Sequence, residues 1–130
     1  MKKIIPILFL AISLVNCNSN NDSMSNFDPS FAHTVYFWFK NPDSQEDRAN
    51  FEKSLSKFLA NSKYAKTKFI GKPPKATRDV VDGSFTYSLI VTFESAEAQV
   101  KYQTEEAHLL FIEESSDIWE KVVVYDSQGI

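Results

Sequence analysis

Apolar and polar side chains alternate along two stretches of the chain, and this pattern predicts β-strands. In residues 33–40, one strand face carries His33, Val35, Phe37 and Phe39, and the other carries Tyr36 and Trp38. A strand that is apolar on both faces must be covered on both faces. Residues 85–93 alternate most cleanly, with Phe85, Tyr87, Leu89, Val91 and Phe93 on one face. Shorter apolar runs predict two further strands over residues 66–70 and 121–126.

Two other stretches predict helices. Phe51, Leu55, Phe58 and Leu59 recur at helical spacing and form one apolar stripe. Asp43 and Glu46 have the spacing of a capping box, which places the start of this helix just after Pro42. Ser95 is expected to cap a second helical region that runs to about residue 120. The consecutive prolines at 73 and 74 predict a surface loop over residues 75–84.

The resulting order, β-α-β-β-α-β, predicts an α+β fold of ferredoxin-like type. In this arrangement a four-stranded antiparallel sheet has both helices on one face. Tyr36, Trp38 and one side of residues 122–125 then remain on the uncovered face. Because an apolar sheet face left open is a predicted interface, we expect a homodimer that packs two sheets face to face.

The N-terminus has the pattern of an export signal. Lys2 and Lys3 precede an apolar stretch over residues 4–15, which is shorter than the roughly 20 residues that span a bilayer. It ends in Leu-Val-Asn-Cys, which resembles a bacterial lipobox, with Asn16 where a smaller residue is usual. We therefore expect a signal peptide over residues 1–17, lipid anchoring at Cys17 and an Asn/Ser-rich tether over 18–31. The alternative is an ordinary secretory signal, which gives a secreted or periplasmic soluble protein.

Composition excludes several classes of protein. The chain has 14 Lys and Arg against 17 Asp and Glu, and its net charge of −3 argues against nucleic acid as a partner. With Cys17 as the one cysteine, no internal disulfide or cysteine-based zinc site can form. A metal site built from the two histidines is not favoured by their spacing, and we predict no cofactor.

Four separated blocks resemble one family. The segments HTVYFWFK, GKPPKATRDVV, FTYSLIVTFESAEAQVKYQTEEAH and WEKVVVYD resemble the stress-responsive dimeric α/β-barrel (Dabb) domain over residues 32–127. The resemblance implies a ferredoxin-like protomer whose dimer forms a barrel. Most members of the family have no assigned activity, and some plant members are polyketide cyclases. In those cyclases a pocket between sheet and helices carries a tyrosine and two histidines, which correspond here to Tyr102, His108 and His33.

The chain departs from the family between Tyr102 and His108. Glu105 and Glu106 stand where the family carries His-Pro, and the change removes a proline that breaks helices. Residues six apart on one continuous helix point roughly 120° away from each other, so helix continuity decides whether Tyr102 and His108 can share a pocket.

The chemistry of these side chains permits acid–base catalysis. A histidine can take a proton from carbon near neutral pH, and a tyrosine hydroxyl can stabilise an enolate. His33 and Phe37 lie on the inner strand face and are expected to line the same cavity, with a core role as the alternative for Phe37. His108 and Tyr102 have their own structural alternative, as residues that complete the core.

Three functions remain open at this point. The first is a dimeric binding domain that accommodates a small apolar or aromatic molecule between sheet and helices, with His33, Phe37 and Tyr102 as ligand contacts. The second is a cyclase-like or lyase-like enzyme with His108 and Tyr102 as the catalytic pair. The third is a structural envelope lipoprotein without a ligand.

Overall fold

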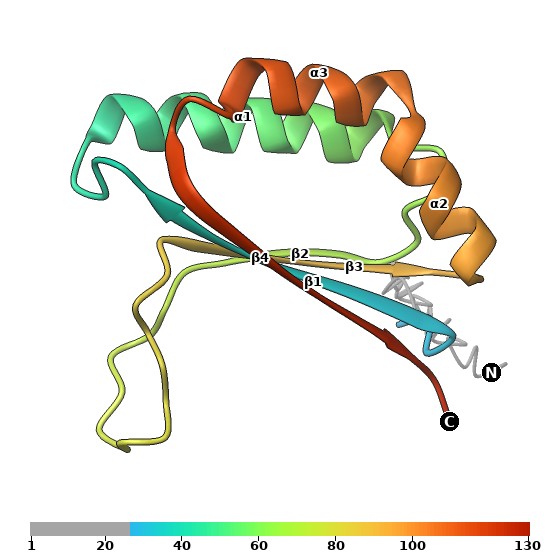
Figure 1. Cartoon of the computed structure of the whole chain (residues 1–130), viewed down its shortest axis with the longest axis horizontal. Helices are drawn as coiled ribbons and strands as arrows, with labels where there is room; N and C mark the ends of the chain where they lie inside the picture. Colours follow the sequence, from blue (N-terminus) through green and yellow to red (C-terminus); the bar gives the residue numbers. More distant parts are fainter. Residues whose placement is uncertain (1–26) are drawn as a thin grey trace, which may run out of the picture.

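The computed structural model describes residues 27–130, in which one layer of helices covers one face of a four-stranded antiparallel sheet (Figure 1). The elements in chain order are β1 (Phe31–Phe39), α1 (Gln45–Asn61), β2 (Lys68–Gly71), β3 (Tyr87–Phe93), α2 (Ala96–Thr104), α3 (Glu106–Ser115) and β4 (Trp119–Gln128). The strand order is β2-β3-β1-β4, so β1 lies at the centre between β3 and β4. This topology confirms the predicted ferredoxin-like fold. The predicted signal peptide, Cys17 and most of the tether lie outside the described residues.

The pairing of β1 decides which side chains face the helices. His33, Val35 and Phe37 lie opposite Val91, Leu89 and Tyr87 of β3. On the other side, the same three residues lie opposite Asp126, Val124 and Val122 of β4. Directly paired residues share a sheet face, so all nine side chains point toward the helical layer.

The core on this face is dominated by aromatic rings around Phe51, which is fully buried on α1. Its ring centroid lies 5.0 Å from those of Phe37, Phe39 and Tyr87, and 5.8 Å from that of Phe111 on α3. The apolar stripe predicted for this helix is confirmed, because all four of its members are buried. Phe51 therefore connects the helices to the two central strands.

The start of α1 differs from the prediction by one residue. The N-cap is Ser44, whose hydroxyl accepts a hydrogen bond from the Asp47 backbone N–H at 3.2 Å. Asp43 remains exposed in the preceding turn, so the predicted Asp43–Glu46 capping box is wrong. Ser95 caps α2 as predicted, by accepting from the Ala98 N–H at 3.1 Å.

None of the helices within residues 27–130 covers the opposite sheet face, which holds its own aromatic cluster. Tyr36 lies at its centre, with ring centroids of Phe85, Tyr125 and Trp38 at 4.9, 6.2 and 6.5 Å. Phe85 was expected beside Tyr87 on the inner face, and this prediction is wrong. Strand β3 begins only at Tyr87, so the alternation does not reach Phe85.

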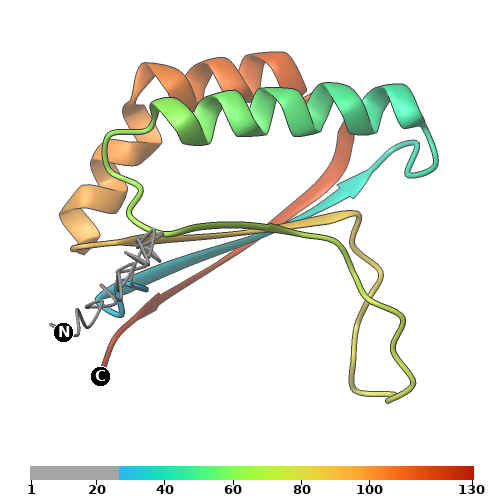
Figure 2. The same ribbon diagram turned by 180° about the vertical axis from the view of Figure 1, so that it is seen from behind.

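The connection between β2 and β3 is the predicted surface loop. It extends away from the helices, on the side of the open sheet face (Figures 1 and 2). Lys72 holds the base of this loop to α1 through a 2.7 Å ion pair with Glu52. Glu52 also accepts a hydrogen bond from the Tyr87 hydroxyl.

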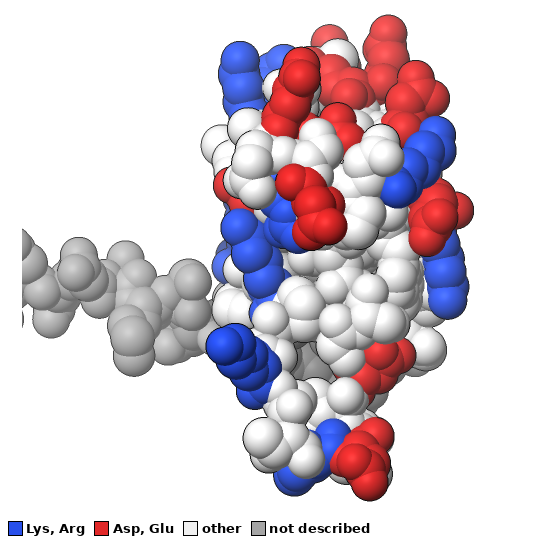
Figure 3. Space-filling view, turned by 90° about the vertical axis from the view of Figure 1, so that its left-hand side faces the viewer, with Lys and Arg blue, Asp and Glu red and all other residues white. Residues whose placement is uncertain are grey.

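Charge is mixed on the end of the molecule seen in Figure 3. Acidic and basic side chains are interspersed there around a band of uncharged surface. This face therefore has no extended basic surface of the kind that phosphate backbones require. No helix formed by residues 27–130 is long and apolar enough to cross a membrane.

Candidate functional site

The second helical region is broken at Glu105, which answers the question of helix continuity, and it ends at Ser115, earlier than the predicted limit near residue 120. Glu105 has extended backbone angles, φ −69° and ψ 145°, between the end of α2 and the start of α3. Figure 1 shows α2 turned away from the direction of α3. Without proline, another cause must stabilise this break.

Two side chains supply that cause. The Glu105 carboxylate accepts a hydrogen bond from the Lys63 backbone N–H at 3.0 Å, which ties the break to the end of α1. The His108 ring donates through Nδ1 to the Gln103 carbonyl at 3.0 Å. The Gln103 carbonyl lies near the end of α2, where helix carbonyls lack backbone partners, and the His108 side chain supplies the missing donor.

The break brings Tyr102 and His108 to one wall of the space between helices and sheet. Their ring centroids are 5.0 Å apart and the ring planes are inclined by 31°. Tyr102 is almost fully buried and His108 is partly buried. Among the described residues no hydrogen bond joins them, so they act as neighbouring groups and not as a bonded dyad.

His33 approaches the same place from the sheet. Its ring lies 5.7 Å from that of Tyr102, and its Nδ1 lies 2.6 Å from a carboxylate oxygen of Asp126. The β1–β4 register places Asp126 directly opposite His33. Asp126 was missed by the sequence reasoning, because only the strand register pairs these two residues.

These side chains line a cavity of about 280 Å³, which we call the inner pocket. Its polar lining consists of His33, Gln99, Tyr102, Gln103, His108 and, from β4, Asp126. Its apolar walls include Val35, Phe37, Phe58, Leu89, Phe111, Ile112, Trp119, Val122 and Val124. All four residues predicted to belong to a site therefore lie on one cavity, and Phe37 belongs to both core and pocket wall.

The hydrogen-bond partners place a hydrogen on Nδ1 of both histidines. A carbonyl oxygen only accepts, so Nδ1 of His108 carries the hydrogen and Nε2 of the neutral ring is an acceptor. A carboxylate also only accepts, so Nδ1 of His33 donates to Asp126. Both rings thus keep Nε2 for another partner.

Burial sets the charge states of His108 and Tyr102. Desolvation lowers the pKa of His108 below its ordinary value, although the Gln103 carbonyl opposes the shift. The nearby His33 lowers this pKa further, while the Glu105 carboxylate raises it. Burial strongly raises the pKa of the Tyr102 phenol, and the Glu105 carboxylate adds to this shift. At neutral pH the pocket therefore contains a neutral His108 and a protonated Tyr102.

The pocket is not organised as a metal centre. Within residues 27–130, no three His, Cys, Asp or Glu residues come together in a way that would hold a metal ion. The titratable groups that line the pocket are the two imidazoles, the Tyr102 phenol and the Asp126 carboxylate.

The fold and the inner pocket define a ferredoxin-like α+β domain with a cavity between sheet and helices. The chain belongs to the stress-responsive A/B barrel domain (Dabb) family, whose model matches residues 31–128. This match confirms the family inferred from the four sequence blocks.

Three solved structures illustrate the likeness. A hydroxynitrile lyase from Passiflora edulis is 23% identical, with a TM-score of 0.64, over 78% of this chain and 94% of that one. A Dabb family protein from Mesorhizobium loti is 16% identical, with a TM-score of 0.65, over 79% and 99%. A dimeric ferredoxin-like protein of unknown function from Thermobifida fusca is 14% identical, with a TM-score of 0.62, over 76% and 90%. Comparison with curated protein sequences gave no match.

Proposed function

We propose that the inner pocket binds a small, largely apolar or aromatic molecule that carries a hydroxyl group. The observation that supports this most strongly is the hydrogen bond from Nδ1 of His108 to the Gln103 carbonyl, which leaves Nε2 of the neutral ring as a hydrogen-bond acceptor. A phenol or enol supplies the donor that this nitrogen needs. A carboxylate has no donor and is repelled by Asp126.

The size of the cavity limits the ligand. Typical ligand pockets measure roughly 300–1,000 Å³, and the inner pocket, at about 280 Å³, is slightly smaller than this range. Its walls are mostly aliphatic and aromatic, so burial of apolar surface supplies most of the affinity and the nitrogen supplies orientation. A compound with one ring and a short alkyl chain suits this space.

A pair of matched probes tests the proposal. We expect 4-propylphenol to raise the melting temperature of the purified protein, and 4-propylanisole, which lacks the hydroxyl hydrogen, to have a much smaller effect. In His108→Ala the phenol should lose at least about fivefold in affinity, since a hydrogen bond is removed. Leu109→Ala, at an exposed neighbouring position, is the control. Equal stabilisation of wild type and His108→Ala would contradict a role for His108.

A second function, acid–base catalysis, is favoured by the charge states of His108 and Tyr102. A neutral imidazole with a free Nε2 is a general base, and a protonated phenol donates to an oxyanion. The likeness to a hydroxynitrile lyase suggests one substrate class to try. We expect cleavage of racemic mandelonitrile, followed by benzaldehyde absorbance, to fall at least 100-fold in His108→Gln. Rates no higher than in protein-free buffer would reject this reaction.

We further propose that the protein is a homodimer that packs through the open sheet face. The aromatic cluster around Tyr36 supports this, as does the dimeric state of the Thermobifida fusca neighbour.

For the N-terminus we propose attachment to the cell envelope through lipidated Cys17. Labelling with a radioactive fatty acid tests the anchor, and Cys17→Ser should abolish incorporation. A structural role without a ligand becomes the better account if no probe binds the inner pocket.

A further inference from the structure

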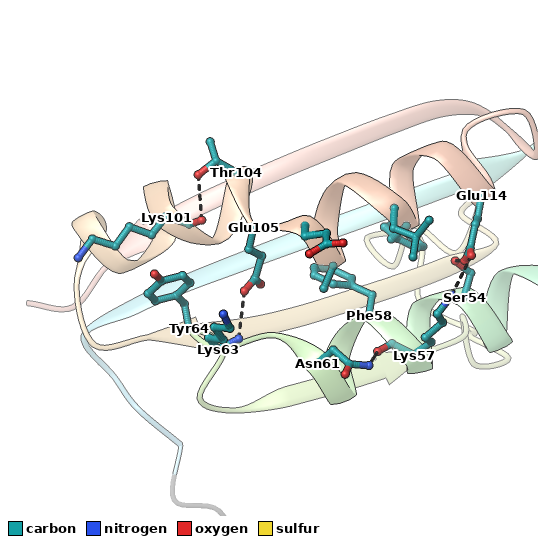
Figure 4. A pocket seen from close by; sticks show the side chains of 14 residues that line it. Ser54, Lys57, Phe58, Asn61, Lys63, Tyr64, Lys101, Thr104, Glu105 and Glu114 are labelled. Carbon is teal, nitrogen blue, oxygen red and sulfur yellow. Dashed lines mark hydrogen bonds and ion pairs between the residues drawn. The ribbon is translucent and has the colours of Figure 1, made fainter.

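Helix α2 contributes side chains to two different cavities. Lys101 and Thr104 line a cavity of about 580 Å³ that also involves α1 and α3 (Figure 4). Gln99, Tyr102 and Gln103 line the inner pocket. Residues three and four positions apart share one face of a helix, so the two glutamines form one stripe with Tyr102. The inner pocket therefore has a polar edge on α2.

The amides of these two glutamines are free. Within residues 27–130 neither side chain makes a hydrogen bond, although the Gln103 backbone carbonyl accepts from His108. Gln99 and Gln103 are both partly exposed, so water is the partner that a ligand would displace. A primary amide offers two N–H donors and a carbonyl acceptor. A ligand can thus bond to either amide without breaking a bond inside the protein.

The amides belong to the polar end of the pocket. The β1–β4 register places His33 opposite Asp126, and the His33 ring lies 5.7 Å from that of Tyr102 on α2. Further along the same strands, Phe37 lies opposite Val122. The four residues from His33 to Phe37 span about 13 Å of strand. The pocket therefore runs from a polar end beside α2 to an apolar end.

A carboxamide is the neutral group that best matches this polar end. Its oxygen accepts from a glutamine N–H, and its own N–H donates to a glutamine carbonyl or to the Asp126 carboxylate. An ester or a ketone has only the acceptor and leaves those carbonyls and Asp126 to water. A carboxylate brings a negative charge that Asp126 repels.

We propose that Gln99 and Gln103 determine the specificity of the inner pocket, by selecting a ligand that carries a carboxamide as well as a hydroxyl group. The hydroxyl donates to Nε2 of His108, and the carboxamide bonds to the glutamine amides on α2. This inference rests on the proposed binding function and identifies the second polar group of the ligand.

Three compounds with the skeleton of 4-propylphenol test the selection. They are 3-(4-hydroxyphenyl)propanamide and the methyl ester and carboxylate of the same acid. In calorimetric titrations of the purified protein, the amide should bind at least about fivefold more tightly than the other two, because it alone forms both hydrogen bonds. In NMR spectra it should also shift the side-chain amide signals of Gln99 and Gln103.

A double variant locates the selectivity. Gln99→Leu combined with Gln103→Leu removes both amides and keeps the backbone carbonyl to which His108 donates. The preference for the amide over the ester should fall below about twofold. Affinity for 4-propylphenol should rise, because leucine adds apolar surface to the pocket. A merely structural role would weaken both ligands. Val100→Leu, exposed on the same helix, should retain the preference of wild type.

The outcomes separate this inference from the proposed function. If 4-propylphenol binds but the amide and the ester bind equally, the inference fails and the proposed function stands. The same holds if the double variant keeps the preference of wild type. If neither 4-propylphenol nor the amide binds, both are overturned.

Discussion

The two faces of the sheet carry similar aromatic side chains but differ in what covers them. On the inner face, Phe51 and its neighbours are sealed by helices, and the rings contact one another from four elements. On the open face, Tyr36, Trp38 and Tyr125 come from adjacent strands and remain partly or largely exposed. The same residue types therefore stabilise the protomer on one face and are available for association on the other.

Removal of a ring from the inner face should have the largest effect. We expect Phe51→Ala to lower the free energy of unfolding by about 3–5 kcal/mol, because it leaves a cavity between α1 and the central strands. Urea denaturation followed by circular dichroism measures the change. Val80→Ala, at an exposed position in the β2–β3 loop, should cost less than about 0.5 kcal/mol. A loss below about 1.5 kcal/mol for Phe51→Ala would show that the inner face is not closely packed.

A charge on the open face should affect association more than folding. We expect Tyr36→Glu to weaken the proposed homodimer at least tenfold, since it places a carboxylate at the centre of the aromatic cluster. Sedimentation velocity over a range of concentrations gives the dissociation constant, and the melting temperature of the variant shows whether its protomer is intact. Val100→Glu on the exposed side of α2 is the matched control. If both variants dimerise like wild type, the open face is not the interface.

Protonation of His108 should weaken the fold as pH falls. The pKa of His108 is lowered in the folded state, while its value in the unfolded chain is about 6.5. At pH values between these two pKa values, the unfolded chain therefore binds more protons than the folded one. The contribution is present above the unfolded pKa and is lost as pH falls through 6.5 toward the folded pKa. Its slope stays below the one-proton limit of about 1.4 kcal/mol per pH unit.

Urea titrations between pH 7.5 and 5.5 measure this slope. His108→Gln keeps a side-chain N–H for the Gln103 carbonyl but does not titrate, so its stability should change less over this range. Identical pH profiles for the two proteins would mean that other groups control the change.

The smallest expected effect is electrostatic. The Glu105 carboxylate raises the pKa of His108, although burial keeps the net shift downward. Glu105→Gln removes this contribution, so the pKa of His108 should fall further below its ordinary value. NMR titration of the His108 ring protons measures the midpoint, with Glu106→Gln as the control. An upward shift in Glu105→Gln would show that the variant exposes the ring to water.

Local sequence patterns were sufficient for most of the fold. The alternation in β3 and the apolar stripe on α1 both arise from burial in one core. Each pattern could therefore be recognised in the sequence without knowing which element it packs against. Phe85 was placed on the wrong face because the alternation ended with the strand. Asp43 was mistaken for the N-cap because Ser44 satisfies the same requirement one residue later.

The site was predictable in its members but not in its geometry. Tyr102, His108 and His33 came from a family resemblance, whereas their arrangement depends on contacts between distant parts of the chain. Glu105 reaches a backbone N–H 42 residues away, and Asp126 reaches a ring 93 residues away. Neither partner is marked by local spacing. Without the proline, the sequence left helix continuity open, and the contact with Lys63 shows why the helix ends.

The bond from His108 to the Gln103 carbonyl has a consequence for how this domain can evolve. Nδ1 of the ring stabilises the helix break through the Gln103 carbonyl, and Nε2 remains available to a ligand in the inner pocket. A substitution that changes the chemistry of the pocket at this position also removes a backbone partner, unless the new side chain carries a donor of similar reach. Relatives that have exchanged this histidine should therefore retain an amide, or regain a helix breaker in the preceding residues. The His108 imidazole thus supports the break between α2 and α3 and also forms part of the wall of the inner pocket.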